Sequence, residues 1–171
     1  MTREGALLVM IAVALALLAI GVIAWRRRTR RDAEIAAPFG ELPEGAVAYA
    51  RSSGLYVATT RHGEPLERLA IRGLGFRSRV EVTVTDRGVA LDLTGQPRMF
   101  LPVERIAGTA LATVAIDRVV EPGGLARVTW RAGDQLVDSY FRPQDSSARA
   151  LRDDIAAVLP TTPTTPTGAD V

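Results

Sequence analysis

Cysteine and lysine are both absent from this chain of 171 residues, and histidine occurs once, at position 62. Without cysteine, the chain can form neither a disulfide framework nor a thiolate metal site, which fits a reducing compartment. With His62 as the single histidine, a zinc site would need carboxylates from distant segments, and no ligand spacing in the sequence indicates one. We therefore expect no metal and no cofactor.

Basic and acidic residues are also nearly equal in number. The 21 basic residues, all arginine, face 19 acidic residues, which leaves a net charge of +2. So small an excess does not indicate a nucleic-acid-binding protein, and we expect no nucleic acid partner. Arginine without lysine, together with abundant alanine, is typical of a GC-rich genome.

Residues suited to catalysis are scarce. His62 lies in the polar turn Thr60–Pro65, where we expect a solvated surface side chain. The glycine-rich stretches 73–75 and 122–124 lack the spacing of a phosphate-binding loop and are predicted to be turns or bulges. Five carboxylates at turns or on strand faces are also expected to be solvated: Asp86, Asp92, Asp117, Asp134 and Asp138. The sequence therefore predicts a protein that is not an enzyme.

One long apolar run dominates the amino-terminal region. Gly5 to Trp25 contains no charged residue, and 21 residues at about 1.5 Å each make a helix of roughly 31 Å, the thickness of a bilayer's hydrocarbon core. Trp25 suits the headgroup boundary at its end. The run is followed directly by a group of basic residues at the predicted membrane interface: Arg26, Arg27, Arg28, Arg30 and Arg31.

This group of arginines sets the expected topology. Basic residues stay on the cytoplasmic side, so the amino terminus is expected outside and the rest of the chain in the cytosol, on a single-pass anchor in the plasma membrane. A cleaved secretory signal is the alternative, but its apolar core is shorter, about 7–15 residues, and ends in a small-residue cleavage site. The same arginines could also bind anionic lipid headgroups.

Composition divides the chain into five parts. Residues 1–4 are expected outside the cell and residues 5–25 in the membrane. Residues 26–44 are predicted to be a basic juxtamembrane linker, because proline and glycine interrupt them. Residues 45–159 are expected to form one folded domain. Residues 160–171, rich in proline and threonine, have almost nothing apolar to bury and are predicted to be disordered.

Apolar residues alternate with polar ones through most of the domain, which indicates strands. The runs 80–85 and 89–93 flank a turn at 86–88 and predict a hairpin. Residues 98–103 predict a short strand near a sheet edge, because Pro102 cannot donate a hydrogen bond. Further strands are expected at 46–52, 55–60, 111–120, 125–131 and 135–142, with a turn at 52–54 separating the first two.

After Pro143 the spacing of apolar residues changes from every second residue, as in a strand, to every third or fourth, as in a helix. Asp145 or Ser146 can cap a helix, and Pro160 stops it. One face of this predicted helix carries its apolar residues, which are Ala148, Leu151, Ile155, Val158 and Leu159. Six or seven antiparallel strands closed by one carboxy-terminal helix predict a mainly β, PH-like (pleckstrin-homology-like) antiparallel barrel, preceded by a transmembrane helix.

The stretch Val80–Thr109 resembles bacterial PH-like domains. In that family a strand pair leads to a strand of the form apolar-Pro-apolar-Glu-x-Ile, and Leu101–Ile106 reads LPVERI. The whole layout resembles actinobacterial single-pass membrane proteins with such a domain, some of which are labelled transporters or export proteins. One span without an intramembrane charge does not make a substrate path, so a transport role could only be that of an accessory subunit.

One group of residues in the domain stands out as candidate binding chemistry: Arg68, Arg72, Arg77 and Arg79. They are either a solvated basic strand edge or a surface for an anionic lipid or an acidic partner. Three aromatic residues also lie on successive predicted strands. Trp130 and one of Tyr140 and Phe141 are expected in the core, and the other could face outward and anchor a partner.

The sequence thus predicts a membrane-anchored cytosolic binding or scaffold module that presents a PH-like domain to an unknown protein partner at the membrane. The alternative is a sensor that binds anionic lipid or another ligand through its arginine surface. An accessory subunit of a transporter, or an enzyme, is a third and more distant possibility.

Overall fold

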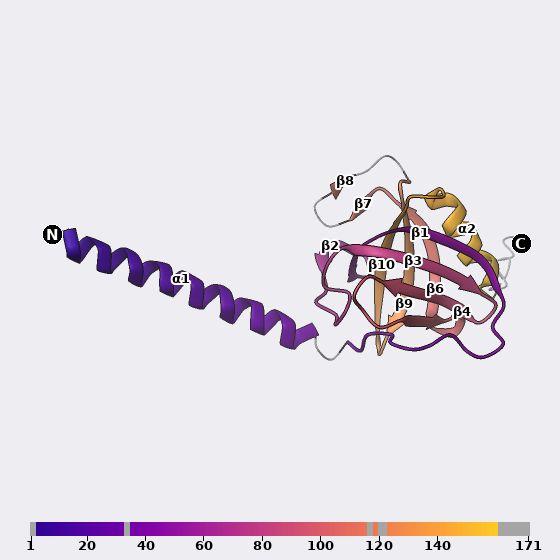
Figure 1. Ribbon diagram of the computed structural model, residues 1–171, viewed down its shortest axis with the longest axis horizontal. Coiled ribbons are helices and arrows are strands. Elements are labelled where there is room, and N and C mark those ends of the chain that lie inside the picture. The colour runs from indigo at the N-terminus through magenta and orange to yellow at the C-terminus, as the bar shows by residue number, and fades with distance from the viewer. Residues whose placement is uncertain (1–2, 33–34, 116–117, 120–122, 161–171) are drawn as a thin grey trace, which may run out of the picture.

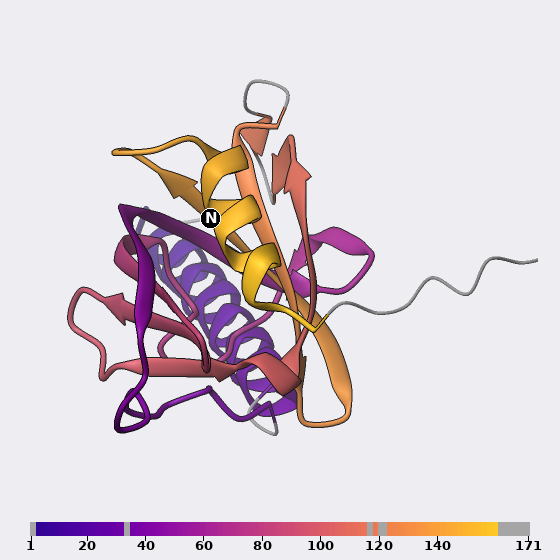
Figure 2. The same ribbon diagram turned by 90° about the vertical axis from the view of Figure 1, so that its right-hand side faces the viewer.

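The computed structural model describes residues 3–32, 35–115, 118–119 and 123–160. Helix α1 projects from one end of a β domain, and helix α2 packs at the opposite end (Figure 1). Figure 2, which faces the α2 end, shows α1 receding behind the domain. The elements are α1 Arg3–Asp32, β1 Ala48–Arg61, β2 Glu64–Arg68, β3 Ser78–Thr85, β4 Gly88–Leu93, β5 Met99–Pro102, η1 Val103–Arg105 (a 3₁₀ turn), β6 Ile106–Ala112, β7 Val114–Ala115, β8 Arg118–Val119, β9 Leu125–Ala132, β10 Gln135–Pro143 and α2 Ala148–Val158.

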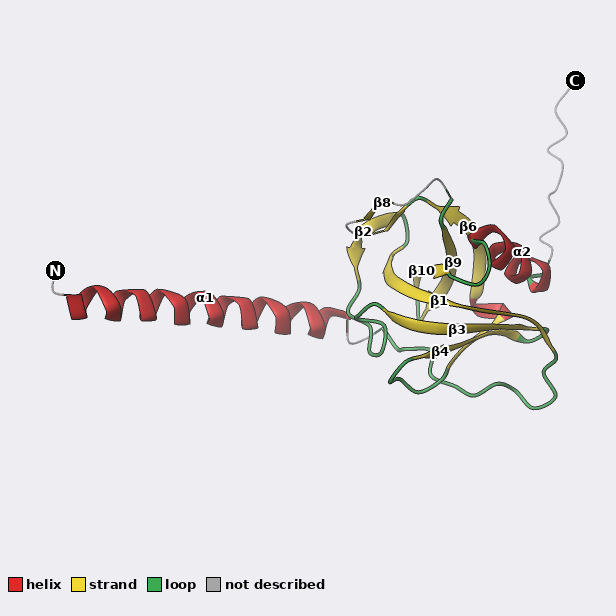
Figure 3. Ribbon diagram, turned by 45° about the horizontal axis from the view of Figure 1, so that its top comes forward, coloured by secondary structure: helices red, strands yellow, loops and turns green. Residues whose placement is uncertain are grey.

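Eight strands form one antiparallel sheet, which confirms the mainly β prediction, although the sheet has more strands than expected. Its order is β5-β4-β3-β1-β10-β9-β6, and β2 pairs with β1 beside this path. The predicted β3–β4 hairpin forms, with Val84 opposite Val89. β5 lies at one end of the order, as its proline indicated. Figure 3 shows the strands bent around a common interior, with both helices outside it.

β1 corrects one sequence prediction. The expected turn at residues 52–54 is absent, and a single strand runs from Ala48 to Arg61. Gly54 is extended, and it is glycine because a side chain there would collide with the carbonyl oxygen of Arg142. β1 pairs with β3 along its first half and with β10 from Gly54 onward. At Gly54, β1 pairs with both β3 and β10 and so joins the two halves of the sheet.

α2 closes the interior as predicted. Ala148, Leu151 and Ile155 are buried, whereas Arg149 and Asp153 are exposed. The buried residues join a core contributed by most of the strands, in which Trp130 is fully buried. An apolar stripe on one side of a short helix is stable only against such a surface.

The cap of α2 corrects a second prediction. Ser147, rather than Asp145 or Ser146, precedes the helix, and its Oγ accepts a hydrogen bond from the Ala150 amide at 3.0 Å. Asp145 instead accepts from the Ser53 amide at 2.7 Å and from the Ser52 hydroxyl at 2.9 Å. The hydrogen bond from the Ser53 amide holds the pKa of Asp145 below its ordinary value. Asp145 therefore ties the start of α2 to β1.

α1 contains one segment that is long and apolar enough to span a membrane. Within this segment, Glu4–Arg27, an 18-residue window has a mean hydropathy of 3.1, and none of that window is buried against the protein. The helix continues through the basic residues to Asp32. The first residues of the segment predicted as a linker are therefore helical.

Residues after α1 dock on the domain. Ile35 and Pro38 are buried, the Phe100 amide donates to the Pro38 carbonyl at 2.8 Å, and the Gly40 amide donates to Arg98 at 3.2 Å. Phe39 thereby forms a bridge with Met99 of β5. The chain then crosses to the α2 end, where β1 begins (Figure 1). The segment predicted as a linker thus covers the outer edge of β5.

Several predictions fall outside the described residues. These are the start of the extracytoplasmic segment at residues 1–2, Asp117, and all of the proline-threonine tail except Pro160. The strand expected at 111–120 is wrong as a single strand, because β6 ends at Ala112 and β7 pairs antiparallel with β8 in a separate two-stranded sheet.

Candidate functional site

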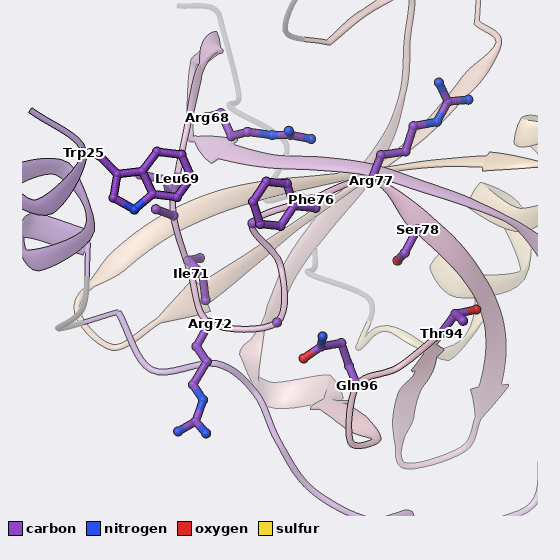
Figure 4. Close-up of a pocket in the computed structure, with 13 residues that line it drawn as sticks. Trp25, Arg68, Leu69, Ile71, Arg72, Phe76, Arg77, Ser78, Thr94 and Gln96 are labelled. Atoms are coloured by element: carbon purple, nitrogen blue, oxygen red, sulfur yellow. The ribbon is translucent and has the colours of Figure 1, made fainter. Parts of the chain in front are cut away.

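A pocket of about 620 Å³ opens beside the end of α1 (Figure 4). One side is the loop that joins β2 to β3, and another is the turn between β4 and β5, which contributes Thr94 and Gln96. Trp25 of α1 forms part of the wall. The pocket therefore unites three segments that are distant in sequence, and one of them belongs to the candidate membrane span.

The β2–β3 loop is fixed from beneath by buried contacts. Leu69, Ile71 and Leu74 each have at most 1% of their surface exposed. The Tyr56 hydroxyl donates to the Leu74 carbonyl at 2.7 Å, and the Leu69 amide donates to Thr59 of β1 at 2.9 Å. Burial raises the pKa of Tyr56 far above its ordinary value, so the hydroxyl stays protonated and able to donate. The loop is consequently a shaped part of the domain.

Gly73 lets this loop pack closely. Its φ is +79°, a conformation that favours glycine. A Cβ atom there would lie 2.6 Å from Cε of Met99 and 3.2 Å from Cζ of Phe39. The loop therefore rests on β5 and on the docked segment that follows α1.

Three of the four predicted binding arginines line the pocket, and the fourth does not. Arg68 is half-buried and donates to the Val57 carbonyl. Arg72 and Arg77 are exposed and extend away from the loop in different directions (Figure 4). Arg79, on β3, is exposed but is not among the lining residues. Arg79 is thus separated from the other three arginines, because it lies on β3 and outside the pocket.

The pocket is basic and amphiphilic. None of the residues that line it is acidic, and in the described part of the chain neither Arg72 nor Arg77 has a hydrogen-bond or ion-pair partner. Phe76 lies between them in sequence and is 71% exposed. Phe76 was not among the binding residues predicted from the sequence. An aromatic residue in a loop between two arginines was the signal that could have identified it.

The predicted membrane-interface residues lie in the last turns of α1. Trp25, Arg26, Arg27 and Arg30 are exposed. Arg28 and Arg31 belong to the same helix, but their side chains lie outside the described structure. Trp25 is the member of this group that also lines the pocket.

Asp138 corrects the expectation that its carboxylate is solvated, whereas His62 is exposed as predicted. Asp138 is only 1% exposed, and the His62 Nδ1 atom lies 3.0 Å from its carboxylate. The Thr129 hydroxyl donates to the same carboxylate at 2.6 Å, and Arg127 lies 3.9 Å away. His62 therefore joins the β1–β2 turn to β10. The sequence could not show this pairing, because 76 positions separate the two residues.

The aromatic residues also differ from the prediction. Trp130 and Phe141 are in the core as expected, but Tyr140 is buried too, with 2% of its surface exposed. It packs with Leu125 and Val57 in a small second cluster. Burial raises its pKa. Tyr140 is therefore unavailable as the exposed anchor for a partner.

Metal-ligating side chains are not clustered in the described part of the chain. Among those residues, no group of three or more His, Asp or Glu side chains is placed to hold a metal ion.

Comparisons with known proteins bear on the fold. A chain of the solved structure titled "The 8S snRNP Assembly Intermediate" aligns with a TM-score of 0.47 and 7% sequence identity, covering 78% of this chain and 96% of that chain. No curated protein sequence matches. The family model described as "Bacterial PH domain-like" matches residues 36–155, more than half of the chain. Its match includes the segment docked on β5 as well as the sheet and most of α2. By this match, the chain belongs to the bacterial PH-like domain family.

Proposed function

We propose that this protein is a membrane-anchored binding module that presents its PH-like domain to a protein partner in the cytosol and does not catalyse a reaction. Its anchor would be the apolar segment of α1. Five arginines follow that segment within six positions, and basic residues of this kind stay on the cytoplasmic side. The anchor would keep the domain, and any partner bound to it, concentrated at the plasma membrane.

An open strand edge carries the proposal. β1 pairs with β3 from Ala48 onward, but its pairing with β10 begins only at Gly54. In the described sheet, the other side of Ala48–Arg51 therefore has no neighbouring strand. Backbone N–H and C=O groups on such an edge can pair with an extended segment of another protein.

The side chains at this edge suit a protein partner. Tyr49 is 65% exposed and Val47 is 55% exposed. Both lie where β1 begins, at the end of the domain opposite α1 (Figures 1 and 3). A tyrosine supplies a large contact area at a low entropic cost, and its position away from the membrane leaves it accessible from the cytosol.

Topology is the first test. A reporter that is active only after export, fused after Val171, should stay silent, while the same reporter fused before Met1 should be active. The opposite pattern would overturn the cytosolic assignment.

Site-specific crosslinking tests the edge. A photoreactive amino acid placed at Tyr49 of the full chain, in its native membrane, should give a protein adduct of discrete mass. The matched control places it at Phe76, an aromatic residue of similar exposure at the α1 end. An adduct at position 76 but none at position 49 would place the partner elsewhere.

A further inference from the structure

β2 is joined to the sheet at few positions. It pairs with β1 only at Thr60 with Arg68 and at Arg61 with Glu64, and the register shifts between these two pairs. It lies at the same end of the domain as α1 (Figures 1 and 3). A strand with so few ladder bonds can open locally without unfolding the domain. The position of residues 62–68, the β2 segment, therefore depends on its other contacts.

The β2 segment reaches the face of the sheet that points away from the main core. Asp138 and Tyr140 lie on this face of β10, because they alternate with residues of the main core, and both are buried. Tyr140 belongs to the small second cluster, on which Val57 packs. Arg68 of the β2 segment donates to the Val57 carbonyl. One end of the segment is thus fixed beside the second cluster.

His62 fastens the other end of the β2 segment to β10. Its amide donates to the Leu136 carbonyl at 3.2 Å, and its Nδ1 atom lies 3.0 Å from the Asp138 carboxylate. The Asp138 side chain is 1% exposed, whereas that of His62 is 46% exposed. The imidazole can therefore exchange protons with solvent while one of its nitrogens contacts a buried group.

The surroundings of Asp138 suit a charged carboxylate. The Thr129 hydroxyl donates to it at 2.6 Å, a short distance typical of a hydroxyl bonded to a charged oxygen. The nearest atom of Arg127 lies 3.9 Å away. A carboxylate removed from water gains most from partners of opposite charge. An imidazolium at position 62 should therefore bind Asp138 more strongly than a neutral imidazole.

The charge on a histidine changes between about pH 5 and pH 8. Neutral imidazole can still donate one hydrogen bond from Nδ1, but a charge-assisted hydrogen bond is roughly twice as strong. The contact between His62 and Asp138 is therefore expected to be strongest at the acid end of this range and to weaken as pH rises through it.

Other ionisable groups surround this contact: Arg127 on β9, Tyr140 on β10, Arg61 on β1, and Glu64 and Glu67 on β2. Arg61 is paired with Glu67 at 3.4 Å. Burial raises the pKa of Tyr140, so its hydroxyl stays neutral. A hydrogen bond with Glu67 raises the pKa of Glu64, so acid also reduces repulsion within β2. These glutamates act in the same direction as His62 and must be separated from it by experiment.

We propose that the β2 segment is a pH-sensitive lid, which protonated His62 holds against buried Asp138 and which loosens over the second cluster when His62 loses its proton. The lid closes more firmly as pH falls. This device belongs to the domain alone, so it depends neither on the proposed anchor nor on the protein partner.

Hydrogen exchange of the full chain in detergent micelles, at about pH 6 and about pH 8, tests the lid. After correction for the intrinsic effect of pH, the His62 amide should be roughly fivefold better protected at the lower pH, because the charge-assisted contact opens less often. The Val103 amide, which donates to Arg87 outside the lid, should keep the same protection at both pH values. Equal protection of the His62 amide at both pH values would overturn the proposal. An equal change at Val103 would also overturn it, because the whole domain would then be responding.

A matched pair of variants separates the histidine from the glutamates. His62→Gln can still donate a hydrogen bond to Asp138 but cannot take up a proton, so the amide at position 62 should lose its pH dependence. Glu64→Gln keeps His62 and removes an ionisable group from the same segment, so the roughly fivefold change should remain. Loss of the change in Glu64→Gln, or its persistence in His62→Gln, would mean that His62 does not control the lid.

Arg127→Gln tests whether charge is the link. This variant removes the second cation beside Asp138, so the carboxylate should depend more on His62. The ratio of protection between the two pH values should then exceed that of the parent. An unchanged or smaller ratio would show that His62 and Asp138 are not coupled through charge, and the proposal would be wrong.

Discussion

Helices α1 and α2 differ in where their apolar residues lie, and this difference sets what each helix can contact. In α1 the apolar residues surround the axis from Gly5 to Trp25, and none of the candidate span is buried in the protein. In α2 they occupy one side, where Leu151 and Ile155 pack on the sheet. A helix with apolar residues on every side needs an apolar environment on every side, whereas an amphipathic helix needs only one apolar surface to pack against. We therefore expect a charged residue introduced into α2 to destabilise the folded domain, and one introduced into α1 to weaken membrane insertion without affecting the fold of the domain.

The largest effect on folding is expected at Ile155, which is fully buried. Ile155→Asp should destabilise the domain by about 4 kcal/mol or more, because the carboxylate would be buried without a partner. Thermal unfolding of the full chain in detergent, followed by circular dichroism, measures the loss. Ala156→Asp places the same charge one residue later on the exposed side and should change little. Equal melting of the two variants would show that α2 does not pack as described.

Leu15, at the centre of the apolar run, should behave in the opposite way. Leu15→Arg should leave the melting of the domain unchanged but reduce the membrane-bound fraction, because an arginine at a bilayer centre costs about 3 kcal/mol on insertion scales. Fractionation of cells expressing the variant measures the distribution, with Leu15→Ala as the control. If Leu15→Arg remained entirely in the membrane fraction, and no other segment held it there, α1 would not be the membrane span.

A smaller effect is expected at the start of α2. Ser147→Ala removes the side-chain oxygen that accepts from the Ala150 amide and should cost about 1 kcal/mol. For a domain of this size that corresponds to a fall in melting temperature of about 4 °C. Ser147→Asp should restore most of the stability, since aspartate is an equally good cap. A variant at Ser146, one of the two cap positions predicted from sequence, should have less effect on the helix than one at Ser147.

The smallest effect is expected from Asp145, through pH. Its pKa is lowered in the folded protein, mainly by the Ser53 amide, so its carboxylate stabilises the fold at neutral pH. That contribution begins to be lost as pH falls below the ordinary carboxyl pKa of about 3.9, because the unfolded state then takes up the proton more readily than the folded state. The loss is complete once pH has fallen through the lowered pKa of the folded state. The stability difference between the parent and Asp145→Asn should therefore shrink in acid, as measured by denaturant unfolding at pH 7 and at about pH 3. A difference that does not change with pH would show that Asp145 acts through packing alone.

Local patterns were sufficient for most of the elements. The β3–β4 hairpin, the edge position of β5 and the buried stripe of α2 follow from the period of apolar residues and from Pro102, which act over a few neighbouring positions. The continuous β1 strand could not be predicted in this way. Gly54 looks like a turn residue in the sequence, and the reason for it lies in the close approach of Arg142, far along the chain.

The candidate site shows the same division. The sequence indicated the arginines at 68, 72, 77 and 79, because they are close together in the chain, but it could not separate the three that line the pocket from Arg79. Nor could it bring Trp25, Thr94 and Gln96 to the same place. The burial of Asp138 beside His62 likewise depends on β1 and β10 being neighbours.

What the sequence by itself determined is therefore what depends on local order: one apolar segment long enough to span a bilayer, a run of strands, and a terminal helix with one apolar face. The periodicities of helices and strands and the thickness of a bilayer are short-range rules, and one segment is enough to read them. The tertiary structure alone decided which distant residues meet, including the docking of residues 35–40 on β5, the pocket beside Trp25 and the open edge of β1. These depend on the pairing of strands and the crossing of chains, which no single segment encodes.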